Sequence, residues 1–450
     1  MTTHSAVSAK NSRRARWSWA LWDWAEQPYP TIMQTFIFAT YIVSAGFGDP
    51  AANTQALSIV GIVAGIAVAL ISPVLGRRSD ENGRRKFWLL VQSGILISIM
   101  ALSFFVEPNP AFLWFGLILY GLGSVVQETA FINYYAMLKS VVSPAKMGRL
   151  SGSAWGLGYA GGIILLLIAL VGFYLGDNHW FGVTNEASMN IRIMFLLAAA
   201  WMLIFTIPMA LFVPETVVKS KGPKQSIAQS YAGVWHQLKT LRAEAPATLR
   251  FLISSAIYRD GLAGVFTYGA ILGAVAFGFE GTDVIFFGIA ANVVAGIGAF
   301  VGGQLDDRIG TRAVIAGSLI GLVIAGLCVF VFAGFGPITY WIGGLALCLF
   351  VGPAQASSRT FVARFTPHGR EGEVFGLYQT TGRAASFLSP TAWLVSVTAA
   401  TAAGVANPAL YGILGLVLIL GVGLVLLLQV DPNPKVLNDL EAELGMPETK

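Results

Sequence analysis

Charge is scarce in this chain of 450 residues. Only 11% of the residues are charged and 55% are hydrophobic, whereas an ordinary soluble domain carries roughly 25% charged residues. The scarcity excludes a water-soluble globule. Runs of about 20 mostly apolar residues, the length that spans a bilayer as a helix, recur between short polar or Gly- and Pro-rich breaks. Because a bilayer admits only helices and closed barrels, and these runs are too long for barrel strands, we predict an all-α membrane protein.

Residues suited to metal binding, disulfides or nucleotide chemistry are also few. The two cysteines, Cys328 and Cys348, lie in apolar runs and give no support for a disulfide framework. The four histidines show no metal-ligand spacing. A phosphate-binding pattern of the type G-x-x-x-x-G-K-[ST] is lacking, which disfavours an ATP-driven pump. We therefore expect no metal, no cofactor and no enzymatic activity.

The chain contains twelve apolar runs, which are grouped into two halves of six. The predicted helices cover residues 19–45, 56–75, 87–106, 111–138, 152–175, 191–213, 249–278, 283–304, 313–335, 337–363, 373–399 and 404–429. The expected domains are a tail (1–18), a six-helix half (19–213), a linker (214–248), a second six-helix half (249–429) and a second tail (430–450). Apolar residues at helical spacing between Ser226 and Leu241 predict either a helix on the membrane surface or a simple linker.

The basic residues set the predicted orientation. Of the 28 lysines and arginines, all but Arg192, Arg259, Arg359 and Arg383 fall in the tails, the linker or the loops of one face of the predicted bundle. Because loops rich in Lys and Arg stay cytoplasmic, both termini are expected in the cytoplasm, with the protein in a bacterial inner membrane. This topology accounts for the formal charge of +5, and no nucleic-acid partner is expected.

A short pattern occurs twice, each time after the second helix of a half. The spacing G-x-x-x-D-x-x-G-x-R is formed by Gly76, Asp80, Gly83 and Arg85, with Arg84 beside it, and again by Gly303, Asp307, Gly310 and Arg312. Glycines at these positions allow close approach and a tight turn, and the Asp is suited to cap a neighbouring helix amino terminus. The repeated pattern resembles the cytoplasmic loop signature of the major facilitator superfamily, and the first copy matches it more closely.

Other segments resemble one subgroup of that superfamily. They are Trp19 to Ala25, Gly152 to Gly162, Gln355 to Arg359 and Phe375 to Tyr378. These segments are similar to the vacuolar amino-acid effluxer family of autophagy and its bacterial relatives. The resemblance implies a secondary transporter that exports amino acids or similar small metabolites by alternating access. The expected partners are then the lipid bilayer, a small-molecule substrate and protons as coupling ions, with the protein acting as a monomer.

Ionisable residues inside the predicted spans are the primary candidates for a functional site. An ionisable side chain in a span costs a few kcal/mol or more, so each of them is a functional hypothesis. The candidates are Asp23, Glu26, Glu128, Arg259, Asp260 and Arg383, with Arg359 set aside because it lies close to a helix end. Aligning the two halves places Asp23 opposite Arg259. We predict that Arg259 pairs with Asp23 or Glu26 and that this pair changes between transport states.

The same set suggests a proton carrier and a polar cavity. Four acids face two bases, so at least one carboxyl is expected to be protonated or to await a cation, and Glu26 and Glu128 are the candidates. The remaining predicted cavity residues are Gln27, Tyr29, Asn133, Tyr258, Gln355, Tyr378 and Gln379. The alternative for the amides is a structural role between helices. Pro28 and Pro30 are expected to free backbone carbonyls in the first helix.

One other class of function remains open. A receptor, channel or lipid-handling protein that does not transport solutes can use the same scaffold. A closed polar centre, or an apolar cavity opening sideways to lipid, favours this alternative. A polar central cavity favours the transporter.

Overall fold

The computed structural model describes residues 13–174, 180–215, 246–279, 281–366 and 369–431, and the regular structure in them is helical throughout. The predicted surface helix at 226–241 lies outside the described residues. The first half contains α2 (Arg13–Glu26), α3 (Phe38–Ile42), α4 (Pro50–Asn82), α5 (Arg85–Ser103), α6 (Leu113–Ala136), α7 (Leu138–Val141), α8 (Met147–Ala169) and α9 (Met189–Phe212). The second half contains α11 (Pro246–Ile271), α12 (Gly281–Ile309), α13 (Thr311–Val331), α14 (Pro337–Phe365), α15 (Glu371–Ala385), α16 (Leu388–Ala402) and α17 (Pro408–Leu427).

Nine helices in the described part of the chain are long and apolar enough to cross a membrane. They correspond to nine of the twelve predicted spans. The other three spans are present as helical segments, but each is either divided or carries charged residues. The first is divided among α2, a π-helical segment and α3, the seventh carries Arg259 and Asp260 within α11, and the eleventh is divided into α15 and α16. The observed helices therefore fit the predicted count.

Prolines explain the two divided spans. A proline has no N–H to donate to the carbonyl four residues earlier. Pro28 leaves the Trp24 carbonyl free, and this oxygen accepts a hydrogen bond from the Trp201 indole at 3.1 Å. The π-helical segment Tyr29–Phe36 follows directly. In the eleventh span, Pro390 lies four residues after Ser386, where α15 ends. The carbonyl freed by Pro28 confirms the expectation for that proline.

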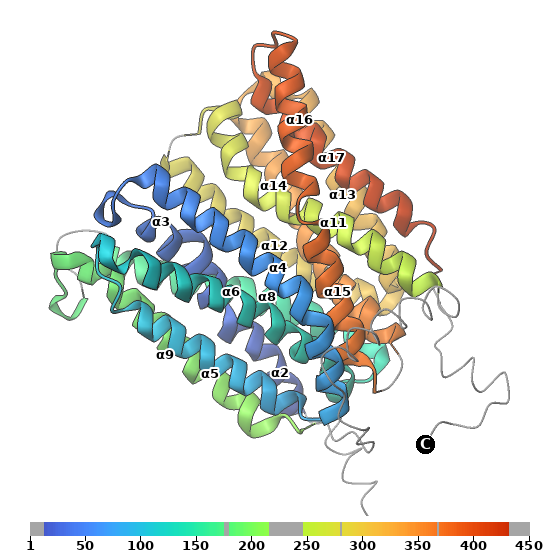
Figure 1. Ribbon diagram of the computed structural model, residues 1–450. Helices are drawn as coiled ribbons and strands as arrows, with labels where there is room; N and C mark the ends of the chain where they lie inside the picture. Colours follow the sequence, from blue (N-terminus) through green and yellow to red (C-terminus); the bar gives the residue numbers. More distant parts are fainter. Residues whose placement is uncertain (1–12, 175–179, 216–245, 280, 367–368, 432–450) are drawn as a thin grey trace, which may run out of the picture.

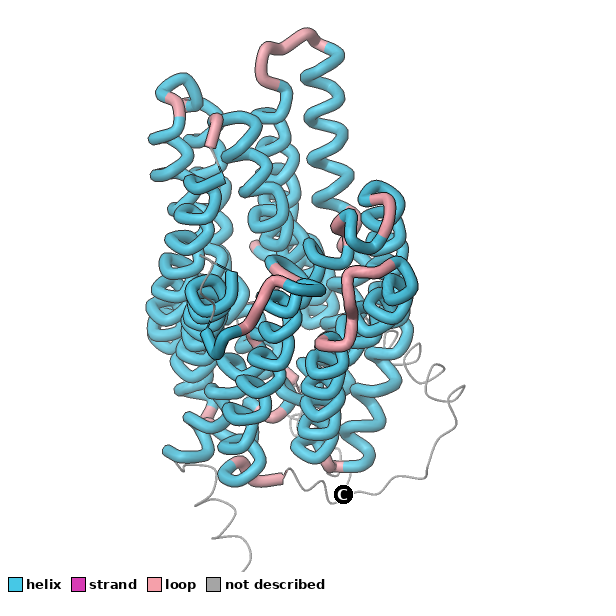
Figure 2. Tube along the Cα trace, turned by 90° about the vertical axis from the view of Figure 1, so that its left-hand side faces the viewer, coloured by secondary structure: helices cyan, strands magenta, loops and turns pink. Residues whose placement is uncertain are grey.

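The two halves lie side by side, and two helix pairs make the most extensive contacts between them. α8 packs against α12, and α4 packs against α15 (Figure 1). The turned view in Figure 2 shows that the axes of the long helices are roughly aligned with one another. We call the end of the bundle that carries the loops after α4, α7, α12 and α14 the basic end. Hydrogen bonds between Arg85 and Glu371, and between Lys139 and Thr366, show that these loops of the two halves meet there.

Candidate functional site

A cavity of about 280 Å³ lies between the two halves. Its wall is drawn from α6 and α8 of the first half and from α11, α14 and α15 of the second. The residues that line it are Glu128, Phe131, Tyr135, Trp155, Arg259, Asp260, Ala263, Gln355, Arg359, Tyr378, Gln379, Gly382, Arg383 and Ser386. Of the residues predicted from the sequence, it brings together Glu128, Arg259, Asp260, Gln355, Tyr378, Gln379 and Arg383.

An ion pair joins the halves across this cavity. Glu128 on α6 pairs with Arg383 on α15. The second carboxylate oxygen of Glu128 accepts a hydrogen bond from Gln379 Nε2 at 2.9 Å. Both side chains of the pair are partly exposed, at 21% for Glu128 and 34% for Arg383. A charged pair that faces the cavity and links two halves must separate whenever these helices move apart.

Arg259 and Asp260 are neighbours on α11 but have different partners. Arg259 Nη1 donates to the Tyr378 carbonyl at 3.1 Å, and Nη2 donates to Gln379 Oε1 at 3.0 Å. Its guanidinium carbon lies 3.8 Å from the centre of the Tyr378 ring, a cation–π contact. Asp260 accepts from the backbone N–H of Ser389 at 2.5 Å, in the first turn of α16. Asp260 therefore caps the helix that starts after the break in the eleventh span.

The predicted pair of Arg259 with Asp23 or Glu26 is wrong for this structure. Asp23 pairs instead with Arg359 of α14, with 3.0 Å between Asp23 Oδ2 and Arg359 Nη1. Both side chains are buried, at 7% and 1% exposure. Arg359 also donates to the hydroxyl and the carbonyl oxygen of Ser151 on α8. This cluster ties α2 and α8 of the first half to α14 of the second.

Aromatic rings surround the Arg359 guanidinium. The ring centres of Trp19, Tyr134, Tyr135 and Trp155 lie 5.0 to 5.7 Å from its central carbon. Arg359 was set aside from the sequence because it lies near a helix end. In the structure, Arg359 lies beside Ser357 and Ser358 in a buried stretch of α14. Spacing along the chain does not show which helix a side chain faces, so the sequence did not predict the contacts of Arg359.

The other predicted cavity residues lie elsewhere in the bundle. Glu26 is buried in the first half and accepts from Gln27 at 3.0 Å and Gln127 at 2.8 Å. Tyr29 donates to the Tyr120 carbonyl at 2.7 Å. The structure places Asn133 between Ser79 and Gln92, and Tyr258 against Ser358. These amides and hydroxyls hold helices of the same half together, which is the structural alternative considered for the amides.

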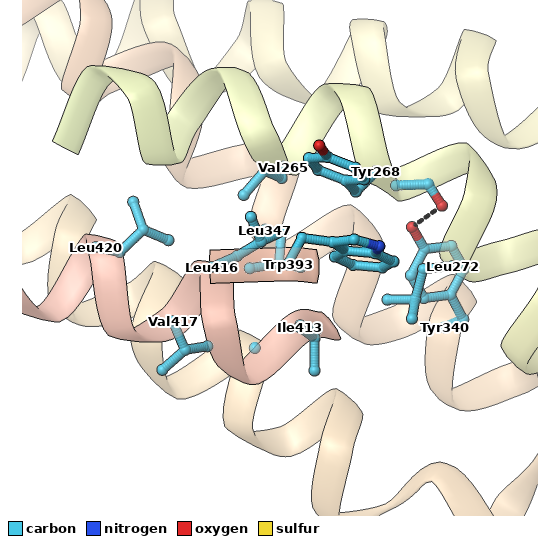
Figure 3. Close-up of a pocket in the computed structure, with 12 residues that line it drawn as sticks. Val265, Tyr268, Leu272, Tyr340, Leu347, Trp393, Ile413, Leu416, Val417 and Leu420 are labelled. Carbon is cyan, nitrogen blue, oxygen red and sulfur yellow. Dashed lines mark hydrogen bonds between the residues drawn. The ribbon is translucent and has the colours of Figure 1, made fainter. Parts of the chain in front are cut away.

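A second enclosed space lies inside the C-terminal half and is too small for a solute. It has a volume of about 20 Å³, roughly one water-sized probe. Figure 3 shows its wall, with the stacked rings of Tyr268 and Trp393 on one side and the hydrogen bond from Tyr340 to the Gly269 carbonyl on the other. The cavity between the halves that is lined by Glu128, Arg259 and Arg383 is therefore the candidate site.

The first copy of the repeated loop pattern binds the opposite half. Asp80 accepts hydrogen bonds from the backbone N–H groups of Gly372 and Glu373, at 2.8 and 2.7 Å, in the first turn of α15. Arg85, 2% exposed, pairs with Asp80 and with Glu371 of the opposite half. Arg84, the residue before it, is exposed at the start of α5.

The glycines of this first copy allow a close backbone contact and a tight turn. A Cβ at Gly76 would lie 2.1 Å from the Gly372 carbonyl oxygen, so the two backbones are in contact. Gly83 has a φ of +60° and ends α4. Asp80 and these glycines thus adopt the geometry expected from their residue types.

The second copy repeats this arrangement. Asp307 accepts from the backbone N–H groups of Gly148 and Arg149, both at 2.9 Å, in the first turn of α8. A Cβ at Gly303 would lie 2.4 Å from the Gly148 carbonyl oxygen, and Gly310 has a φ of +89°.

The arginine of the second copy has a different position. Arg312 donates to the carbonyls of Leu427 and Leu428 at the end of α17. The cation beside Asp307 is Arg364 of α14, which also pairs with Asp306. The second ion cluster therefore lies within one half.

Two pseudo-symmetric helical halves, a cavity between them and the same capped loop in each half define a membrane transporter of the major facilitator superfamily. Solved structures support this fold. The proton:xylose symporter XylE bound to 6-bromo-6-deoxy-D-glucose is 13% identical, with a TM-score of 0.73 over 96% of this chain and 98% of that one. A bacterial homologue of the iron transporter ferroportin in an outward-facing state is 14% identical, with a TM-score of 0.65 over 92% of this chain and 98% of that one.

The chain belongs to the family described as "vacuole effluxer Atg22 like", whose model matches residues 138–435. Among curated proteins, it is 28% identical to an uncharacterized MFS-type transporter, YxiO, of Bacillus subtilis, over 85% of this chain and 87% of that protein. It is 24% identical to autophagy-related protein 22-1 of Neosartorya fischeri, over 66% of this chain and 50% of that protein. These comparisons confirm the family resemblance read from the sequence.

Proposed function

We propose that the protein is a secondary active transporter that moves a small solute by alternating access through the cavity between its halves. The observation that carries the proposal is the cavity wall, to which both halves contribute charged residues. Rocking of two rigid halves exposes such a central site first to one side of the membrane and then to the other. The Glu128–Arg383 pair crosses the interface and would be broken or remade in each cycle.

The orientation in this proposal follows from the basic residues. With the basic end in the cytoplasm, both termini are cytoplasmic and the protein lies in a bacterial inner membrane. The cross-half contacts of Arg85, Asp80, Asp307 and Lys139 then close the cytoplasmic side beneath the cavity. On this basis we propose that the structure corresponds to a state in which the solute exchanges with the outer side.

The proposed substrate is an amino acid or a related small metabolite, and the proposed direction is export. The family description supports efflux. The volume of about 280 Å³ suits a solute of this size and is small for a polymer.

Proton coupling is proposed to run through Glu26 and Glu128. Glu26 is buried, 3% exposed, and makes no ion pair with any of the described basic residues. Its two side-chain hydrogen bonds come from the amides of Gln27 and Gln127, so no described cation neutralises this carboxyl group. Glu128 faces the cavity and is held by Arg383 and Gln379. The two carboxyls offer one proton site at the solute cavity and one away from it.

Transport in proteoliposomes tests the function and its coupling together. Counterflow with labelled amino acids, sugars and organic ions identifies the solute, and a pH gradient then tests coupling. We expect wild type to respond to the gradient, Glu26→Gln and Glu128→Gln to lose the response, and the exposed Glu186→Gln to behave as wild type. A rate indifferent to the gradient in wild type and both variants would remove proton coupling from the proposal.

A lipid-handling function is the second candidate, and one observation favours it. A cleft of about 410 Å³ lies between α8 and α12, and nearly all of its wall is apolar. Trp17, Ile297 and Phe300, which line it, are about half exposed. Lipid scrambling in the same proteoliposomes distinguishes this candidate: scrambling without solute counterflow favours it, and counterflow without scrambling favours the transporter.

A further inference from the structure

The charged residues that line the central cavity differ in whether they are neutralised. Arg383 pairs with Glu128, and Arg359 pairs with Asp23. Asp260 is satisfied by a backbone N–H of α16. Arg259 is the exception, because in the part of the chain that the structure describes it contacts neutral acceptors and pairs with no carboxylate. A cation within a membrane span costs about 3 kcal/mol or more when nothing compensates it.

Arg259 is also held in a fixed position. The Tyr378 carbonyl and the Gln379 side chain accept from its two terminal nitrogens, and the Tyr378 ring covers one face of the guanidinium at 3.8 Å. Gly382 lies one helical turn further along α15, and a Cβ there would be 3.1 Å from Nη1. The guanidinium has five N–H donors, and the described contacts use only one on each terminal nitrogen. Donors therefore remain for a ligand in the cavity.

We infer that Arg259 is the anion-binding residue of the cavity and that the transported solute carries an anionic group, a carboxylate or a phosphate. A guanidinium matches these planar or tetrahedral oxyanions with two parallel hydrogen bonds. The inference rests on the proposed function of the cavity and extends it to the charge of the substrate. An arriving anion supplies the counter-charge that Arg259 lacks.

Gln379 is assigned as a positioning residue for this contact. Its Oε1 accepts from Arg259, and its Nε2 donates to Glu128 at 2.9 Å. One amide side chain thus connects the anion site to the Glu128–Arg383 pair that joins the halves. An anion that competes with Gln379 for the donors of Arg259 would change the hydrogen bonding of Glu128 through this single residue, which links occupancy to the interface.

The test measures ligand-induced thermal stabilisation of the purified full-length protein in detergent. The probes are three pairs in which one member loses its anionic group: L-leucine with L-leucinamide, glucuronate with glucuronamide, and glucose 6-phosphate with glucose. The variants are Arg259→Gln, Arg259→Lys and Arg250→Gln. Arg250 is an exposed residue near the start of α11, so its substitution removes the same charge from the same helix away from the cavity.

We expect at least one probe with an anionic group to stabilise wild type and Arg250→Gln, and its partner without that group to fail. Arg259→Gln should weaken that binding at least tenfold, and Arg259→Lys should restore part of it because the charge returns without the planar fork. The inference is overturned if no probe with an anionic group stabilises wild type, if a partner that lacks the anionic group binds equally well, or if Arg259→Gln binds like wild type.

Failure of the inference is distinguishable from failure of the proposed function. Arg259-dependent binding without counterflow removes transport and keeps the anion site. Counterflow of a neutral solute that Arg259→Gln leaves unchanged keeps transport and removes the anion site.

Discussion

After α4 and after α12, the same residue pattern places an aspartate on two backbone N–H groups of the opposite half. Asp80 caps α15, and Asp307 caps α8. The arginines differ. Arg85 pairs across the interface with Glu371, whereas Arg364 pairs with Asp306 and Asp307 of its own half. Opening the basic end must therefore break an ion pair at the first loop. The second loop loses its helix cap and the hydrogen bond from Arg364 to the Pro144 carbonyl, but its charges stay paired.

The backbone contact common to both loops should give the largest effect. Gly76→Ala and Gly303→Ala each place a Cβ within 2.4 Å of a carbonyl oxygen of the other half. The backbones must then move apart, and we expect counterflow to fall more than tenfold in both variants. Gly94→Ala and Gly317→Ala are matched controls in the following helices, because a Cβ there meets nothing within 4 Å. Normal counterflow in the Gly76 and Gly303 variants would show that the close contact is dispensable.

Substitution of the two arginines of the pattern should show the difference between the two loops most clearly. Arg85→Gln removes the cation that pairs with the buried carboxylates of Asp80 and Glu371, and breaking comparable buried pairs costs about 3–5 kcal/mol. Arg312→Gln removes only hydrogen bonds to two carbonyls, about 1 kcal/mol each. Thermal unfolding in detergent measures both. Equal losses of stability would contradict the asymmetry described above.

The smallest effect is expected from neutralising the two capping aspartates. In Asp80→Asn and Asp307→Asn the single amide oxygen can accept from one of the two N–H groups, whereas the NH2 group cannot accept from the other, so each variant should lose about 1–2 kcal/mol. Because both caps bind the opposite half, both variants should also shift the protein toward opening at the basic end. Distances between spin labels on the basic ends of the two halves measure that shift. A shift in one variant only would mean that the caps are not equivalent.

The apolar runs and turn residues made most of the fold predictable from the sequence. Helix boundaries follow from length and hydropathy, and the two loops follow from Gly83, Gly310 and the aspartates, since turn and cap chemistry is local. The break between α15 and α16 was missed, although Pro390 carried the signal. Local rules therefore recovered the parts of the structure that depend on neighbouring residues.

The ion pairs could not be predicted in the same way. Position along a helix gives the depth of a side chain in the membrane but not the neighbour it faces. Asp23 and Arg259 correspond across the internal repeat, yet Asp23 turns toward Arg359 on α14, and Arg259 turns toward Tyr378 on α15. The placement of Glu128 and Arg383 at one cavity was within reach because both lie deep in their spans, but their direct pairing depends on how α6 meets α15.

The buried pair of Asp23 and Arg359 has a consequence for a transporter that holds no solute. In the proposed rocking of the halves, opening of the basic end would pull α2 away from α14, and each charge would lose its partner inside a shell of aromatic rings. A cost of about 3–5 kcal/mol for parting such a pair slows a thermally driven step by about two to four orders of magnitude. Unloaded molecules then seldom turn over, and the membrane is protected against futile leakage.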